Sequence, residues 1–133
     1  MLRTLPVRKY FDNPNAVNRS ELKPCRDSSL YNHLLMSAYL KITGDTAGVV
    51  VQPDGTVVAN CPDGYFWYSP SCRSNPAQCI VFFSPASGNG LSDVLQKATK
   101  WNMPLGVGVG MTAAEWRDLP TKHKSMFYWC LGG

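Results

Sequence analysis

Five cysteines constrain the fold of this 133-residue chain more than any other feature of its sequence. Cys61, Cys72 and Cys79 fall within one short stretch bounded by Pro and Gly, and Cys25 lies upstream. Their spacing does not match the Cys-x-x-Cys or Cys/His patterns of structural zinc, so no metal site is expected. Four of them can form two disulfides in any of three pairings, which leaves Cys130 unpaired. The sequence therefore predicts a domain stapled by disulfides among Cys25, Cys61, Cys72 and Cys79.

This prediction implies an extracellular or other oxidising compartment, because disulfides are rare in the cytosol. No secretory signal is visible, however, since Pro6, Arg8 and Lys9 occupy the place of its apolar segment. Two interpretations remain open. Either a signal was lost with an upstream region, or five reduced cysteines pack as small hydrophobic residues in a cytosolic protein. The triplet Asn18-Arg19-Ser20 is an N-glycosylation acceptor, which matters only in a secretory setting.

Composition and charge indicate a single globular domain. Hydrophobic residues make up 44% of the chain and charged residues 17%, which is typical of a folded protein with one core. The net charge of +4 comes from basic residues scattered along the chain, so no nucleic-acid partner is expected. No apolar run approaches the roughly 18 residues that a membrane span needs, so no transmembrane segment is expected.

Turn and periodicity signals divide the chain into an extended lead-in over residues 1–24 and an α/β domain over residues 25–133. The first helix of the domain is expected to begin with a capping Asp27 or Ser28 and to end near Gly44. Its apolar stripe consists of Leu30, Tyr31, Leu34, Leu35, Ala38 and Tyr39, which lie three and four residues apart.

Beyond this helix, short strands and helices alternate. Residues 47–52 and 56–61 are β-branched runs joined by Pro53-Asp54-Gly55, which favours an antiparallel hairpin. The further expected elements are strands at 80–83, 105–109 and 125–130, a helix at 91–101, and a short helix that begins at the capping box Thr112-Ala113-Ala114-Glu115 and ends at Pro120. This alternation predicts an α/β fold with a mixed sheet, flanking helices and a Cys-rich loop.

Signatures of catalysis are weak. The Gly-x-Ser-x-Gly setting of a nucleophilic serine is missing, so we expect neither an enzyme nor a bound cofactor. The run Gly106-Val107-Gly108-Val109-Gly110 lacks the G-x-G-x-x-G register and the Lys-Ser/Thr that follow in phosphate-binding loops. We expect instead a strand whose glycines allow close backbone contact.

Two aromatic clusters are the candidate binding residues. One is Tyr65-Phe66-Trp67-Tyr68 and the other is Phe127-Tyr128-Trp129. Aromatic faces attract cations through the ring quadrupole, and proteins hold quaternary ammonium groups in this way. Buried aromatic rings are also ordinary core material, and the sequence pattern does not distinguish these two roles.

Several segments resemble the later part of a group of eukaryotic microbial and algal proteins. Those proteins are similar to the glycine-betaine-type substrate-binding component of ABC transporters. The segments are Pro24–Tyr31 (PCRDSSLY), Cys61–Ser74 (CPDGYFWYSPSCRS), Gln78–Ile80 (QCI), Lys97–Leu105 (KATKWNMPL) and Phe127–Trp129 (FYW). The resemblance covers most of the chain from about Pro24 onward, and its Cys/aromatic stretch is specific to that eukaryotic group, whereas the link to bacterial betaine binders is more distant.

The resemblance implies a single lobe or part of a type 2 periplasmic-binding fold, in which two α/β lobes close on a small ligand. It implies binding of glycine betaine or a similar quaternary-ammonium solute, with a membrane transporter subunit or a missing second lobe as partner. Relatives continue Phe-Tyr-Trp with a second Trp where this chain has Cys130. The candidate ligand contacts are therefore Trp129 and Tyr128, with Trp67 and Tyr68, although the last two fit core positions equally well. The alternative is a disulfide-stapled extracellular interaction module without a small-molecule ligand.

Overall fold

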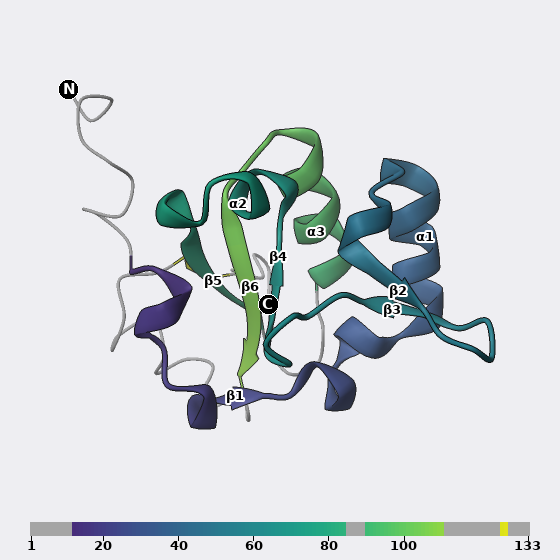
Figure 1. The fold of residues 1–133 in the computed structure, drawn as a ribbon, viewed down its shortest axis with the longest axis horizontal. Coiled ribbons are helices and arrows are strands. Elements are labelled where there is room, and N and C mark those ends of the chain that lie inside the picture. The colour runs from purple at the N-terminus through teal and green to yellow at the C-terminus, as the bar shows by residue number, and fades with distance from the viewer. Residues whose placement is uncertain (1–11, 85–89, 111–125, 128–133) are drawn as a thin grey trace, which may run out of the picture.

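The computed structural model describes residues 12–84, 90–110 and 126–127, and these combine helices and strands in one mixed arrangement (Figure 1). The strands are β1 (Leu22–Lys23), β2 (Val49–Val51), β3 (Val57–Ala59), β4 (Phe66–Tyr68), β5 (Ile80–Ser84), β6 (Leu105–Gly110) and β7 (Met126–Phe127). The α-helices are α1 (His33–Thr43), α2 (Pro70–Ser74) and α3 (Leu91–Lys100), and 3₁₀ turns occupy Pro14–Ala16, Arg19–Glu21, Cys25–Asp27, Ser29–Tyr31, Thr46–Gly48 and Pro76–Gln78. The mixture of helix and strand expected from the sequence is confirmed.

Strand β6 is the centre of a mixed sheet. It pairs in parallel with β5, and β5 pairs in parallel with β7 on its other edge. The second edge of β6 pairs antiparallel with β4 and, further along, with β1. The expected strands 80–83 and 105–109 are therefore confirmed, and β7 lies within the expected strand 125–130. The remainder of that strand and the helix expected from Thr112 to Pro120 lie outside the described residues.

The hairpin and the second amphipathic helix also form as expected. β2 and β3 pair antiparallel, and Gly55 in their turn has a φ of 89°, a left-handed value that glycine adopts without strain. Helix α3 connects β5 to β6, because parallel neighbours need a long crossover connection. The apolar residues Leu91, Leu95 and Ala98 are fully buried on one side of α3.

Helix α1 begins later than the sequence predicts. The side chain of Asn32 accepts a hydrogen bond from the Leu35 N–H at 3.0 Å, so Asn32 caps α1. Ser28 instead caps the preceding 3₁₀ turn, since its hydroxyl accepts from the Leu30 N–H at 3.1 Å. Leu30 is buried although it belongs to that separate turn, which explains why its apolar side chain fits the spacing of the α1 stripe. The expected end is confirmed at Gly44.

The glycines of β6 lie beneath the aromatic rings of β4. Cross-strand register pairs Phe66 with Gly108 and Tyr68 with Gly106. A Cβ at position 108 would lie 2.7 Å from Cε1 of Phe66, and a Cβ at position 106 would lie 2.5 Å from Cγ of Pro14. No side chain fits at such distances. The expectation of close backbone contact is confirmed for this Gly-rich strand.

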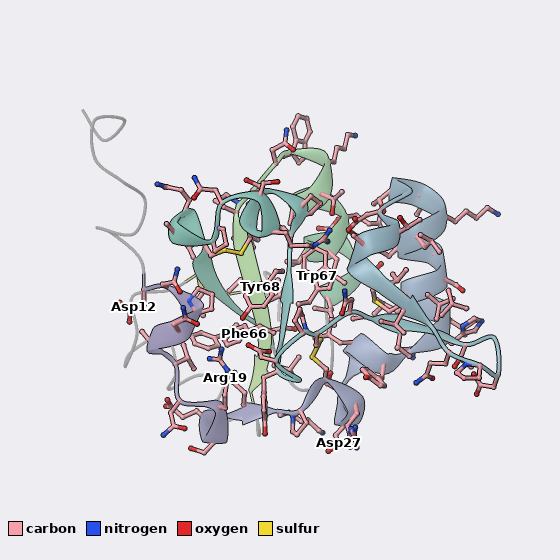
Figure 2. All side chains as sticks on the ribbon, in the orientation of Figure 1. Asp12, Arg19, Asp27, Phe66, Trp67 and Tyr68 are labelled. Atoms are coloured by element: carbon pink, nitrogen blue, oxygen red, sulfur yellow. A yellow bond between two sulfur atoms is a disulfide. The ribbon has the colours of Figure 1, made fainter. Side chains whose placement is uncertain are left out.

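Strand alternation sorts the remaining core into two faces. Trp67, Phe82 and Val107 face α1, α3 and the hairpin, where the larger cluster of buried side chains lies. Phe66 and Phe83 face the opposite way, into a cluster of buried residues that also contains Val17, Leu22 and Val81. Figure 2 shows this division at β4, with Trp67 on one side of the strand and Phe66 and Tyr68 on the other.

Residues 12–24, part of the segment interpreted as an extended lead-in, pack against this second face. Leu22 is 1% exposed, and β1 adds to the sheet at the last two residues of β6. The Arg19 guanidinium donates to the carbonyls of Pro14 and Val17 and to Asp63, and it lies 4.7 Å from the centroid of the Phe66 ring. This arginine therefore ties the N-terminal segment to the rest of the domain.

The two disulfides join Cys25 to Cys61 and Cys72 to Cys79, one of the three pairings that the sequence left open. The first connects the turns before α1 to the chain that follows β3. The second closes the segment between β4 and β5. Two such bridges indicate an oxidising compartment. Cys130 lies outside the described residues.

Candidate functional site

The three parallel strands end at one edge of the sheet. Ser84, the last residue of β5, pairs with Val109 of β6, and Phe83 pairs with Phe127 of β7. In open α/β sheets, ligands bind outside the carboxyl ends of the strands. The predicted contacts Tyr128 and Trp129 follow β7 directly in the sequence and lie outside the described residues. This carboxyl edge is the first candidate site.

Trp67 lies in the core and not at a surface. Its side chain is 0% exposed, and the Tyr39 ring meets it edge-on with centroids 5.7 Å apart. The indole N–H donates to the carbonyl of Gly48 at 3.1 Å. The guanidinium of Arg73 lies 5.7 Å from the ring centroid. With its faces and its N–H occupied by protein groups, Trp67 offers no surface to a solute.

Tyr68 points to the face opposite Trp67, so the structure does not bring these two candidates together. Its hydroxyl donates to Asp63 at 2.8 Å, and burial together with that carboxylate raises the pKa of Tyr68 far above its ordinary value. Asp63 also accepts from the backbone N–H groups of Tyr65 and Phe66. A cavity of about 170 Å³ beside Tyr68 borders the Cys72–Cys79 bridge. The hydroxyl of Tyr68 therefore helps to stabilise the turn that contains Asp63.

A polar cluster centred on Asp45 joins four segments of the fold. Arg73 of α2 donates two hydrogen bonds to the Asp45 carboxylate, at 2.9 and 2.6 Å. The Tyr39 hydroxyl of α1 donates to the same carboxylate at 2.6 Å and lies 2.6 Å from the Thr99 hydroxyl of α3. The sequence analysis missed these residues, because they are far apart in the chain and match no motif.

The environment of this cluster shifts two pKa values in opposite directions. Burial alone would raise the pKa of Asp45, but hydrogen bonds from Arg73 and Tyr39 outweigh it and hold that pKa below its usual value. Burial, and then the hydrogen bond to Asp45, raises the pKa of Tyr39 to about 12. At neutral pH Asp45 is therefore an ionised carboxylate paired with the Arg73 guanidinium, and Tyr39 is a neutral phenol that donates to it.

We expect the Asp45 cluster to contribute to stability above pH 4 and to lose that contribution in acid. The folded state holds the Asp45 pKa below the unfolded value of about 3.9, so the unfolded chain takes up the proton first as the pH falls. Urea titrations from pH 7 to pH 2 should show a shallower loss of stability for Asp45→Asn than for the parent chain. Equal slopes for the two proteins would contradict this assignment.

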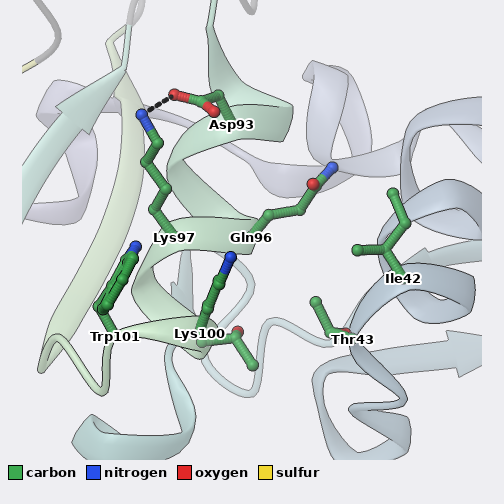
Figure 3. Close-up of a pocket in the computed structure, with 8 residues that line it drawn as sticks. Ile42, Thr43, Asp93, Gln96, Lys97, Lys100 and Trp101 are labelled. Carbon is green, nitrogen blue, oxygen red and sulfur yellow. Dashed lines mark ion pairs between the residues drawn. The ribbon is translucent and has the colours of Figure 1, made fainter.

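The second candidate site is an open groove of about 690 Å³ between the C-terminal end of α1 and the face of α3 from Asp93 to Trp101 (Figure 3). Ile42 and Trp101 line it and are 64% and 65% exposed. The ammonium of Lys100 lies 5.4 Å from the centroid of the Trp101 ring, and Lys97 pairs with Asp93. Because α3 runs from the end of β5 to the start of β6, Trp101 lies at the end of α3 remote from the carboxyl edge.

Neither a metal site, nor a membrane-spanning helix among the described residues, nor a similar known protein points to a function. Among the described residues, no group of three or more His, Cys, Asp or Glu side chains is placed to hold a metal ion. None of the helices described is long and apolar enough to cross a membrane. Comparison of the chain with protein-family models, with curated proteins and with solved structures finds no match.

Proposed function

We propose that this chain binds a small cationic or zwitterionic solute of the glycine betaine type, as a lobe or part of a lobe of a type 2 periplasmic-binding fold. The observation that supports this proposal is the parallel arrangement of β6, β5 and β7, whose carboxyl ends share one edge. The pair Tyr128-Trp129 comes directly after the last residue of β7. The aromatic pair therefore follows a strand end at the edge where α/β sheets bind ligands.

A betaine bound at that edge would need one group for its cationic end and another for its carboxylate. A quaternary ammonium has no N–H to donate, so aromatic faces are the groups that recognise it, at about 0.5–2 kcal/mol for each ring. A carboxylate requires N–H donors, and α3 is the next helix or strand after β5 in the chain, so its first turn is the candidate source of them. Gly90, which precedes α3, has no side chain with which to cap the helix. The first turn of α3 and the Tyr128-Trp129 pair would hold the two opposite charges.

As a solute-binding lobe, the chain would act with a second lobe or with a membrane transporter subunit in an extracellular compartment. The two disulfides support such a location. Trp67 is not among the proposed contacts because it is buried. Tyr68 is not among them either, because its hydroxyl is bonded to Asp63.

Titration calorimetry with glycine betaine, choline and proline betaine tests the proposal. We expect binding of at least one solute, and we expect replacement of Trp129 by Ala to weaken it about 2- to 30-fold, the equivalent of losing one aromatic wall. Trp101→Ala is the matched control, because Trp101 lies at the far end of α3. The absence of heat from all three solutes at millimolar concentration would reject binding by this chain alone.

The groove between α1 and α3 favours the alternative, an interaction module without a small ligand. Ile42 and Trp101 are exposed apolar side chains, and Lys97 and Lys100 line the same groove. This chemistry fits an acidic protein segment with apolar side chains. The same variants distinguish the two functions. Trp101→Ala would weaken binding of a protein partner and leave betaine binding unchanged. Trp129→Ala would weaken betaine binding and leave binding of the protein partner unchanged.

A further inference from the structure

We propose that Asn18 carries an N-linked glycan. The triplet Asn18-Arg19-Ser20 is the one Asn-x-Ser/Thr sequence with a residue other than Pro in the middle in this chain. Neither the proposed solute site nor the groove uses it. Its local structure, its exposure and the compartment indicated by the disulfides all support the same modification.

The triplet is folded into an Asx turn. The side-chain oxygen of Asn18 accepts the backbone N–H of Ser20 and the Ser20 hydroxyl, each at 3.0 Å. These contacts span only two residues, so they can form before the rest of the domain has folded. They use the oxygen of the carboxamide and not its nitrogen. No hydrogen bond from Nδ2 of Asn18 to residues 12–84, 90–110 or 126–127 is present.

The folded domain has room for a glycan at this position. Asn18 and Ser20 are both exposed. The intervening Arg19 turns the other way, toward Phe66 and Asp63, and anchors the turn through its bonds to Pro14 and Val17 (Figure 2). A sugar on Asn18 would thus extend into solvent from a fixed turn, without displacing a core contact.

The transfer requires an oligosaccharide donor of the lipid-pyrophosphate class. Nδ2 of Asn18 forms a bond to the anomeric carbon of the sugar. The bond between that carbon and the pyrophosphate oxygen breaks, the lipid pyrophosphate leaves, and the amide nitrogen gives up one proton. Such donors are used in the oxidising secretory pathway, the kind of environment in which the Cys25–Cys61 and Cys72–Cys79 bridges form.

The full chain, produced behind a cleavable secretion signal in a eukaryotic host, tests the proposal by intact mass and peptide mapping. We expect one glycan on the peptide containing Asn18, released by an amidase that converts the modified Asn to Asp. Asn18→Gln and Ser20→Ala should both lack it, and Ser20→Thr should retain it. Asn15→Gln changes another exposed asparagine three residues away and should keep the glycan.

Secretion of a chain with both disulfides intact but without sugar would overturn the proposal. A glycan that persists in Asn18→Gln would overturn it as well, because the modification would then lie elsewhere. Non-reducing peptide mapping of each variant separates loss of the acceptor from loss of the fold. A variant that forms both bridges and lacks the glycan has lost the acceptor alone.

Discussion

Removing the Cys25–Cys61 bridge is expected to lower the free energy of unfolding by about 4 kcal/mol. The two cysteines are 36 residues apart, and a cross-link over a loop of that length restricts the unfolded chain by about that amount in the chain-entropy model. Because small domains are stable by only about 5–15 kcal/mol, the double variant Cys25→Ser/Cys61→Ser should unfold at a much lower urea concentration.

The second bridge supplies the comparison. Cys72 and Cys79 are 7 residues apart, so their removal should cost only about 2 kcal/mol in the same model. Urea unfolding of the two double variants under identical conditions measures the difference. An equal or reversed order of destabilisation would contradict the loop-length explanation, and non-reducing peptide mapping of the parent chain would identify a wrong pairing directly.

Replacing Trp67 by Ala is expected to destabilise the domain by about 3–5 kcal/mol, the range for deleting a large buried aromatic side chain. The loss combines the cavity left beside Tyr39 with the lost hydrogen bond to the Gly48 carbonyl. Trp67→Phe keeps a ring in the core but removes the N–H donor, so it should cost less.

Trp101→Ala is the control for this series, because that tryptophan is 65% exposed and its removal should change stability by about 0.5 kcal/mol or less. Urea unfolding gives the free energies, and betaine titration of Trp67→Phe tests whether the Trp67 indole takes part in ligand binding. A core residue changes stability without changing the affinity of the folded protein. If Trp67→Ala cost no more than Trp101→Ala, the core assignment of Trp67 would be wrong.

Local signals were sufficient to predict the elements whose residues agree with one periodicity. The hairpin around Gly55 and helix α3 follow from turn chemistry and from an apolar stripe. The start of α1 was wrong because a stripe reports spacing and not hydrogen bonding: Leu30 is buried by a 3₁₀ turn, and the cap is Asn32. Ser28 and Asn32 are both residue types that cap helices, so the sequence pattern does not reveal at which of them α1 begins.

The contacts that could not be predicted are those between distant residues. The residues next to Asp45 and Arg73 in the sequence give no sign that these two side chains pair. The cysteine spacings, likewise, are compatible with several pairings. For the candidate site, strand alternation alone separates Trp67 from Tyr68, since adjacent strand residues face opposite sides. The site prediction grouped them by aromatic type. The predicted ligand contacts of Tyr128 and Trp129, which lie outside the described residues, stay predictions.

The late position of β6 in the chain affects the order in which this protein is assembled during synthesis. Strands β1, β4 and β5 all pair with β6, yet each precedes it in the sequence. Leu22 of β1, for example, pairs with Gly110, which is 88 residues later in the chain. All four bridged cysteines also precede β6. A nascent chain can therefore oxidise before its central strand has left the ribosome, while the surfaces meant for that strand stay uncovered. The time between synthesis of β5 and synthesis of β6 then affects how long those surfaces stay exposed to aggregation.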